Sequence, residues 1–126
     1  MIGADTHSVL WLTRAQHLLS PAADRALAEA SEVAISDMTL WEVAMMVSRK
    51  RVLIDRPLDA YLRHIESEFV VLPITGKIAE RAMQFSQDFP RDPADRIIAA
   101  TALVHGIQLV TGDAQILASK EVDCIW

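Results

Sequence analysis

Cysteine and glycine are both scarce in this sequence of 126 residues. The single cysteine, Cys124, excludes an internal disulfide and any zinc site built from several thiolates. Four glycines cannot supply the phosphate-cradling loops of nucleotide-binding proteins, and neither G-x-G-x-x-G nor G-x-x-x-x-G-K-[ST] occurs. The motifs H-E-x-x-H and G-x-S-x-G are also missing. Most signatures of small-molecule enzymes are therefore absent.

Long hydrophobic runs are missing as well. The longest stretch without a formal charge lies between Arg96 and Asp113, and His105 and Gln108 interrupt it. It is too short and too polar to span the ~30 Å of hydrocarbon in a bilayer. Residues 1–5 lack the basic segment and apolar run of a signal peptide. We therefore expect no membrane segment and no export, with the cytoplasm as the location.

Basic residues are outnumbered, with 12 Lys and Arg against 17 Asp and Glu, and the net charge is −5. This balance argues at first against a nucleic-acid partner, which usually meets a basic surface. Hydrophobic residues make up 52% of the chain, which is enough to bury a core. The length suits one domain, and we expect it to cover residues 1–126.

Short apolar segments alternate along the chain with longer segments of helical periodicity. Strands are predicted at residues 1–4, 33–35, 69–72, 107–110 and 122–125. Helices are predicted to begin near Asp5, Ser20, Ser36, Pro57, Thr75, Asp92 and Asp113. Strands that alternate with helices indicate a parallel sheet covered on both faces, which is a three-layer α/β fold.

Four acidic residues follow predicted strands or begin predicted helices. Asp5 follows the first strand, and Asp113 follows strand 107–110 after a Thr-Gly turn. Glu42 lies in the early turns of the helix after strand 33–35, and Asp95 begins a helix that is apolar almost all round. Functional crevices of such sheets lie beyond the carboxyl ends of the strands. We therefore expect these four carboxylates to meet at one edge.

Each acid also has a purely structural interpretation. Glu42 and Thr39 match the capping box S/T-x-x-E, in which the glutamate bonds back to the helix start. Asp95 occupies the third helical position, where the helix dipole favours a carboxylate. Asp5 and Asp113 could each cap the helix that follows them. Taken singly, none of the four requires a functional site.

Taken together, four ionised carboxylates in one cleft would repel one another by several kcal/mol unless a cation lay among them. Hard oxygen ligands suit Mg²⁺ or Mn²⁺, which can activate water and polarise a phosphoryl oxygen. Binding of two such ions would change the net charge from −5 to −1. The cluster Arg49-Lys50-Arg51 could then face a nucleic acid, or it could be a solvated helix end. This combination is typical of a nuclease.

Four blocks of the sequence, in order, resemble PIN-domain ribonucleases of the VapC type. They are D-T-H at 5–7 with L-W-L at 10–12, S-D-M-T-L-W-E at 36–42, D-P-A-D-R-I-I-A-A-T-A at 92–102 and L-V-T-G-D at 109–113. The third block is the most specific. The resemblance implies a Rossmann-like α/β/α fold, with a parallel sheet of four or five strands in a single PIN domain.

The resemblance also implies a site. Asp5, Glu42, Asp95 and Asp113 would bind Mg²⁺ or Mn²⁺, and Thr111 would line that site. Asp95 is chosen over its neighbour three residues earlier because it directly precedes the arginine and the apolar helix.

Members of this family are typically toxins of bacterial toxin–antitoxin pairs. They cut structured RNA such as transfer RNA, are held inactive by a VapB-type antitoxin, and commonly dimerise. One departure is Gly112, which stands where a basic residue is common and so removes a phosphate contact. A catalytically weak binding module, acting through antitoxin or dimer contacts, is therefore the alternative.

A phosphoacceptor signalling domain would share the length and the acidic pocket. It needs a lysine after a late strand, and none of Lys50, Lys77 and Lys120 follows strand 107–110. Two histidines, His7 and His105, could be general bases, but their positions favour structural roles. The apolar stripe Met38, Trp41, Met45 and Met46 favours a core or dimer interface.

Overall fold

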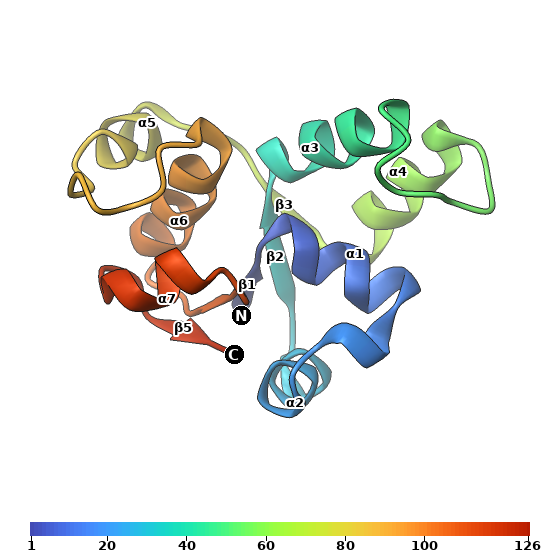
Figure 1. The fold of residues 1–126 in the computed structure, drawn as a ribbon, viewed down its shortest axis with the longest axis horizontal. Helices are drawn as coiled ribbons and strands as arrows, with labels where there is room; N and C mark the ends of the chain where they lie inside the picture. The colour runs from blue at the N-terminus through green and yellow to red at the C-terminus, as the bar shows by residue number, and fades with distance from the viewer.

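A computed structural model describes residues 1–126, and it confirms the predicted alternation of strands and helices (Figure 1). The elements in chain order are β1 (Ile2–Ala4), α1 (Thr6–Arg14), the 3₁₀ helix η1 (Gln16–Leu18), α2 (Pro21–Glu29), β2 (Val33–Ser36), α3 (Asp37–Ser48), α4 (Leu58–Glu68), β3 (Val70–Leu72), α5 (Gly76–Ala82), α6 (Pro93–His105), β4 (Leu109–Val110), α7 (Ala114–Ser119) and β5 (Cys124–Ile125).

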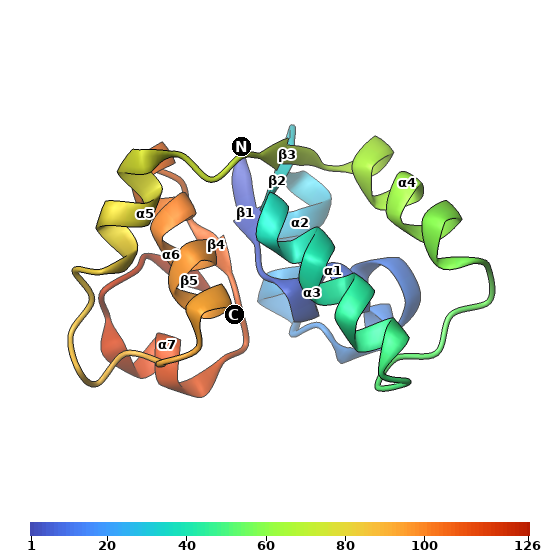
Figure 2. The same ribbon diagram turned by 90° about the horizontal axis from the view of Figure 1, so that it is seen from above.

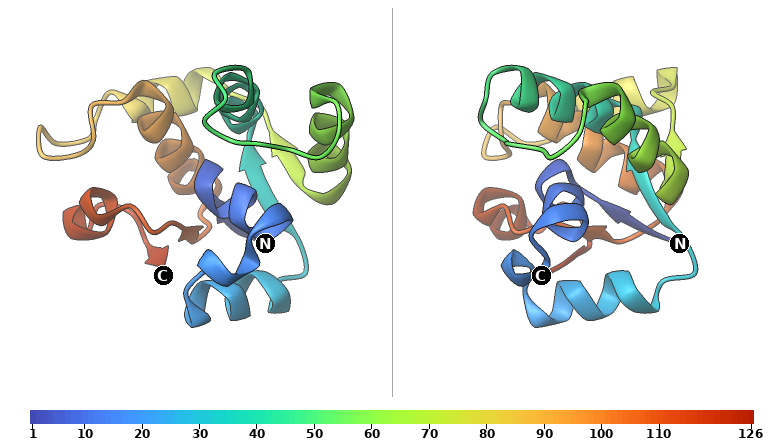
Figure 3. Two further views of the ribbon diagram at one scale, coloured as in Figure 1. Left: turned by 45° about the vertical axis from the view of Figure 1, so that its right-hand side comes forward. Right: turned by 90° about the vertical axis from the view of Figure 1, so that its right-hand side faces the viewer.

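The five strands form one parallel sheet in the order β3-β2-β1-β4-β5. The first strand is central, and Gly3 pairs with Ala34 on one side and with Leu109 on the other. Helix α6 packs on β2, and α2 packs on β4 and β5. Figure 3 shows these two helices on opposite sides of the sheet. The protein is therefore a three-layer α/β/α fold, as predicted.

The core lies on both faces of this sheet. One cluster packs around Val9, Ile35 and Ile65, and the other around Ile78 and Phe89, all of them fully buried. Helix α6 belongs to the second cluster and buries residues on most of its faces, as its apolar sequence predicts. Burial fixes this helix against the sheet, and its first turn, which carries Asp95, lies at the edge where the acids are expected.

Local sequence signals set most helix ends. The side chains that accept a hydrogen bond from the first turn of the following helix are Asp5, Ser20, Ser36, Thr75, Asp92 and Asp113. Helix α6 ends at Gly106, whose φ of 64° is the left-handed conformation that glycine adopts most easily. The predicted caps thus lie at the helix starts that the structure shows.

The capping box predicted at Thr39 and Glu42 is wrong. Strand β2 runs directly into α3, and Ser36 is the cap, with its hydroxyl accepting from Met38 N–H. Thr39 therefore lies inside the helix and is fully buried. Glu42 consequently has no role at the start of its helix.

None of the seven α-helices combines the length and the apolar composition that crossing a bilayer demands.

Candidate active site

All four predicted acids line one cavity of about 440 Å³ at the carboxyl edge of the sheet. Figure 2 shows α6 and α7 in one half of the molecule and α1 and α3 in the other. Asp5 precedes α1, Glu42 lies on α3, Asp95 begins α6, and Asp113 precedes α7. The cavity therefore draws its carboxylates from both halves.

Hydrogen bonds hold Asp5 through both of its carboxylate oxygens. Ser8 N–H donates to Oδ1 at 2.9 Å, and the Thr111 hydroxyl donates to Oδ2 at 2.6 Å. Thr111 Oγ1 in turn accepts from Asp113 N–H at 3.1 Å. Thr111 is fully buried and does not line the cavity. Its hydroxyl instead lies beneath the site and connects two of the acids.

Asp113 is both a helix cap and a cavity residue. Its Oδ1 accepts from the backbone N–H groups of Gln115 and Ile116, each at 2.9 Å. Oδ2 has no protein partner. The capping interpretations of Asp5 and Asp113 are thus correct, and both caps also face the cavity.

Glu42 is held from the neighbouring helix. The Thr6 hydroxyl donates a short hydrogen bond to Glu42 Oε1, and Thr39 Oγ1 lies 3.3 Å from Thr6 Oγ1. Burial raises the pKa of Glu42, an effect that the Thr6 bond opposes and that the nearby charge of Asp92 reinforces. Both threonines are buried, so their hydroxyls are polar groups inside the protein.

Asp95 is the most perturbed acid of the cavity. Its pKa is raised to about 7, first by burial and then by the charges of Asp92, Asp113 and two further acids. None of the contributions is a hydrogen bond. This carboxylate is therefore half-buried among like charges with no donor of its own.

Sequence reasoning did not include Asp92 in the site. It caps α6 by accepting from Ala94 N–H at 2.8 Å, and it also lines the cavity. Among the neighbouring charges, it has the largest effect on the pKa of both Glu42 and Asp95. The spacing of three residues between Asp92 and Asp95 was a signal for this, because residues three apart share a helix face.

Few cations balance these charges. Arg51 lines the cavity, whereas Arg49 and Lys50 do not. Arg96 follows Asp95 in sequence but points away, and its Nε donates to the Pro90 carbonyl at 2.7 Å. No arginine, lysine or histidine forms an ion pair with a cavity acid, because the molecule's two ion pairs lie on the exposed surface elsewhere.

The donor set suits a hard divalent cation. Asp95 offers two free oxygens, and Glu42 and Asp113 offer one each. No three His, Cys, Asp and Glu side chains already stand in an arrangement that would hold a metal ion. A cation would therefore have to draw these carboxylates closer together, and its positive charge would offset the repulsion among them.

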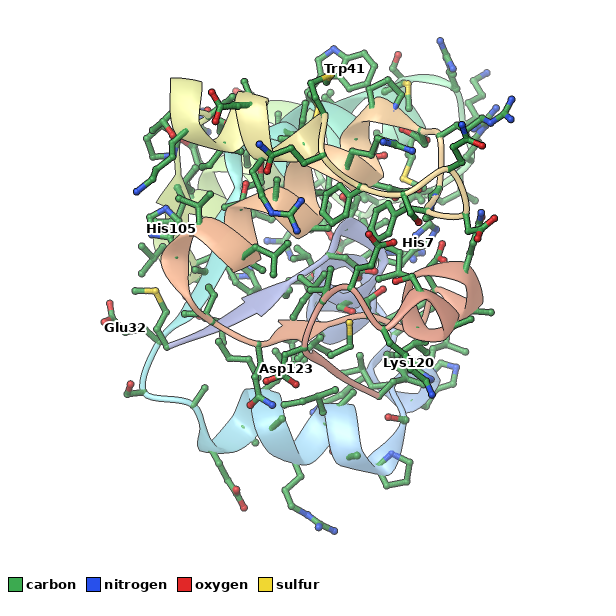
Figure 4. All side chains as sticks on the ribbon, turned by 90° about the vertical axis from the view of Figure 1, so that its left-hand side faces the viewer. His7, Glu32, Trp41, His105, Lys120 and Asp123 are labelled. Carbon is green, nitrogen blue, oxygen red and sulfur yellow. The ribbon has the colours of Figure 1, made fainter.

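One wall of the cavity is aromatic. His7 and Trp11 line it, with ring centroids 5.6 Å apart, and Trp11 lies 5.6 Å from Trp126. A β-carbon on Gly112 would come within 2.8 Å of the Trp126 ring, so that ring occupies the place of a side chain there. His7 is exposed, and Figure 4 shows it in projection between α7 and the loop that enters α6.

A second, more apolar cavity of about 650 Å³ adjoins the first and shares Glu42, Met45 and Asp92 with it. Trp41 lines it and is 59% exposed, as the labelled side chain in Figure 4 illustrates. Other predicted residues lie away from both cavities. His105 is exposed at the end of α6, and Cys124 is half-buried in β5, where burial raises its thiol pKa to about 11.

The fold and the acidic cavity together define a nuclease-like α/β domain, and comparison with known proteins identifies its family. The PIN domain family matches residues 4–121, and the chain belongs to that family, in its VapC group. Ribonuclease VapC22 of Mycobacterium tuberculosis is 33% identical over 116 residues, which are 92% of this chain and 89% of that protein.

Solved structures share the fold. A toxin–antitoxin complex from Klebsiella pneumoniae superposes with a TM-score of 0.73 at 25% identity, covering 100% of this chain and 97% of that one. Mycobacterium tuberculosis VapC20, described as a toxin that cleaves the sarcin–ricin loop, gives a TM-score of 0.69 at 20% identity, covering 98% of each chain.

Proposed function

We propose that this protein is a Mg²⁺- or Mn²⁺-dependent endoribonuclease, the toxin of a bacterial toxin–antitoxin pair. The observation that carries the proposal is the cavity in which Asp5, Glu42, Asp95 and Asp113 converge without an ion pair to any basic side chain. A similar protein is a ribonuclease, and a structural neighbour is described as a toxin that cleaves the sarcin–ricin loop. RNA, including transfer RNA, is accordingly the expected substrate.

The proposed metal ligands differ in how they are held. Asp5 and Asp95 would bind most tightly, while Glu42 and Asp113 would complete the shell or position water. A bound divalent ion would lower the pKa of water and stabilise charge on the phosphate oxygens. Asp5 enters this arrangement already oriented by Thr111, which we assign a positioning role.

The remaining groups of the cavity would guide the substrate. Arg51 is the one basic side chain among its lining residues, and we propose that it contacts a phosphate of the RNA. Thr6 fixes the Glu42 carboxylate so that only its free oxygen is available. Asp92 adds negative charge, which favours binding of a cation before binding of the anionic strand.

A VapB-type antitoxin is the proposed partner, because structural neighbours of this chain are toxin–antitoxin complexes. A homodimer is also proposed. The exposed Trp41 and the half-buried Met38 and Met45, which line the second cavity beside the acids, form an apolar surface of the kind that a second chain covers. Either interaction would lie close enough to the acids to affect access to them.

Cleavage of total bacterial RNA by purified, antitoxin-free protein tests the proposal. Discrete fragments are expected with Mg²⁺ or Mn²⁺, and none with EDTA or with Asp95→Asn. Asp88→Asn is the matched control, since Asp88 is exposed and lines neither cavity. A folded protein that binds metal but cuts nothing would contradict the nuclease proposal and favour the binding module.

A further inference from the structure

The aromatic wall beside the acids points to a second element of substrate recognition. We define the aromatic shelf as His7, Trp11 and Trp126, whose rings follow one another at centroid distances of 5.6 Å. Two of its members, His7 and Trp11, line the same cavity as the carboxylates. We infer that the shelf stacks an unpaired nucleobase of the RNA strand whose phosphate is cut, so this inference rests on the proposed function.

The charge of the cavity makes such a contact necessary. RNA-binding proteins usually gain affinity by neutralising phosphates, but here five carboxylates and only one arginine, Arg51, line the cavity. A single bound strand would therefore be held poorly through its backbone. Stacking on aromatic rings does not depend on net charge, and it recognises bases that are free of pairing.

The arrangement of the shelf leaves a ring face for a base. Trp11 and Trp126 are half-buried and pack against the core, which fixes their orientation. His7 is exposed at the outer end, so one side of it is in contact with Trp11 and the rest is in contact with solvent. Gly112 contributes by leaving room for Trp126, since any side chain there would require that ring to move.

Binding of two matched RNA probes tests the inference without requiring cleavage. In an Asp95→Asn background with Mg²⁺, affinities are measured for a fluorescein-labelled 12-nucleotide oligoadenylate and for an oligomer of the same length whose riboses lack bases. We expect the base-bearing oligomer to bind about 5- to 100-fold more tightly, the range that stacking supplies. His7→Ala should remove most of that preference and leave the affinity for the abasic oligomer unchanged.

The choice of variants separates stacking from other roles of His7. His7→Phe keeps a ring and should retain the preference, whereas a proton-transferring or charge role would not survive this change. His17→Ala is the control, because His17 is exposed on η1 and does not line the cavity. Equal binding of both oligomers, or equal loss in His7→Phe and His7→Ala, would overturn the inference.

The result is independent of whether RNA is hydrolysed. Wild-type protein that cuts no RNA while the base preference persists would refute the nuclease function and leave the shelf as a binding surface. Metal-dependent cleavage with no base preference would support the nuclease function and refute the role of the shelf. Failure of either oligomer to bind at micromolar concentrations would also count against the shelf.

Discussion

The two sides of the acidic cavity are built in different ways. On the side of β1 and β4, Asp5 and Asp113 are fixed by backbone N–H groups and by the buried Thr111 hydroxyl. On the side of α3 and α6, Asp95 has no donor at all, and burial and neighbouring charge raise its pKa to about 7. One side is oriented by the fold, and the other is left electrostatically unfavourable.

This difference bears on the proposed metal site. The hydrogen bonds of Asp5 and Asp113 orient these two carboxylates and stabilise the helix starts that they cap. In the proposed site, a bound cation would relieve the repulsion around Asp95 and so gain free energy of binding. The two kinds of carboxylate should therefore respond differently to substitution.

The largest expected effect is loss of cleavage. Asp5→Asn and Asp95→Asn should each lower the rate of RNA cleavage by roughly 100-fold or more, since each removes a proposed metal ligand. Circular dichroism should show that both variants remain folded. Retained activity in both variants would refute the proposed site, while Asp88→Asn should behave as wild type.

Metal binding should tighten as pH rises. A cation must displace the proton from Asp95, and with a pKa of about 7 this carboxyl is mostly protonated at pH 6 and mostly ionised at pH 8. We expect the affinity for Mn²⁺, measured by calorimetry, to increase about 10-fold over this interval. Proton release on binding should be largest near pH 6.

Asp92→Asn tests the cause of this pH dependence of Mn²⁺ binding. Asparagine caps a helix as well as aspartate does, so the start of α6 should be preserved. The charge that raises the pKa of Asp95 most is removed, and the pH dependence should therefore shift to lower pH. An unchanged pH profile would mean that the charge of Asp92 does not act on Asp95.

The stability of the metal-free protein should separate the two sides of the cavity. Asp95 holds a proton in the folded state up to a pKa of about 7 but loses it near 3.8 when unfolded, so the wild type loses stability as pH rises between these values. Asp95→Asn removes this penalty. At pH 8 it should raise the free energy of unfolding by about 1 kcal/mol, a value reduced for solvent screening.

Asp5→Asn should lower the free energy of unfolding, in contrast to Asp95→Asn. An amide has one acceptor oxygen, so either the Ser8 or the Thr111 hydrogen bond is lost, at about 1 kcal/mol. Urea unfolding of the two variants at pH 8 and pH 4 provides the comparison. Near pH 4 the gain in stability of Asp95→Asn should vanish. Equal changes in stability in both variants would contradict the difference between the two sides of the cavity.

The smallest effects should come from the supporting hydroxyls. Thr111→Val keeps the shape but removes the donor to Asp5, and it should slow cleavage several-fold, since one hydrogen bond contributes about 1 kcal/mol. Thr6→Val frees Glu42, and a change of about 2- to 3-fold is expected. Cleavage kinetics at saturating metal measure both effects. A larger effect for Thr6→Val than for Thr111→Val would mean that Glu42, not Asp5, is the tighter metal ligand.

Sequence reasoning succeeded where the signal is local. The strands, the caps at Ser20, Thr75 and Asp92, and the end of α6 at Gly106 all depend on residues within a few positions of one another. The meeting of four acids at one edge was also predictable, because parallel strands place their carboxyl ends together.

The features that sequence reasoning missed depend on contacts between residues that are distant in the sequence. The Thr39 capping box failed because α3 begins directly after Ser36, the other start signal in this segment, so Thr39 already lies inside the helix. Nothing near Thr6 in sequence indicates that it donates to Glu42, 36 residues away. The contact between Gly112 and Trp126 likewise arises only when α7 and β5 have folded back toward the sheet.

The central position of β1 has a consequence for how the protein is made. Its neighbours are β2 and β4, and the hydrogen bond from Thr111 to Asp5 spans 106 residues. Contacts of such high sequence separation form late in folding, because a long loop must close first. A nascent chain that has reached only α5 already contains Asp5 and Glu42 but lacks Asp95, Thr111 and Asp113. The acidic cavity therefore cannot form on the ribosome until the final part of the chain has been synthesised.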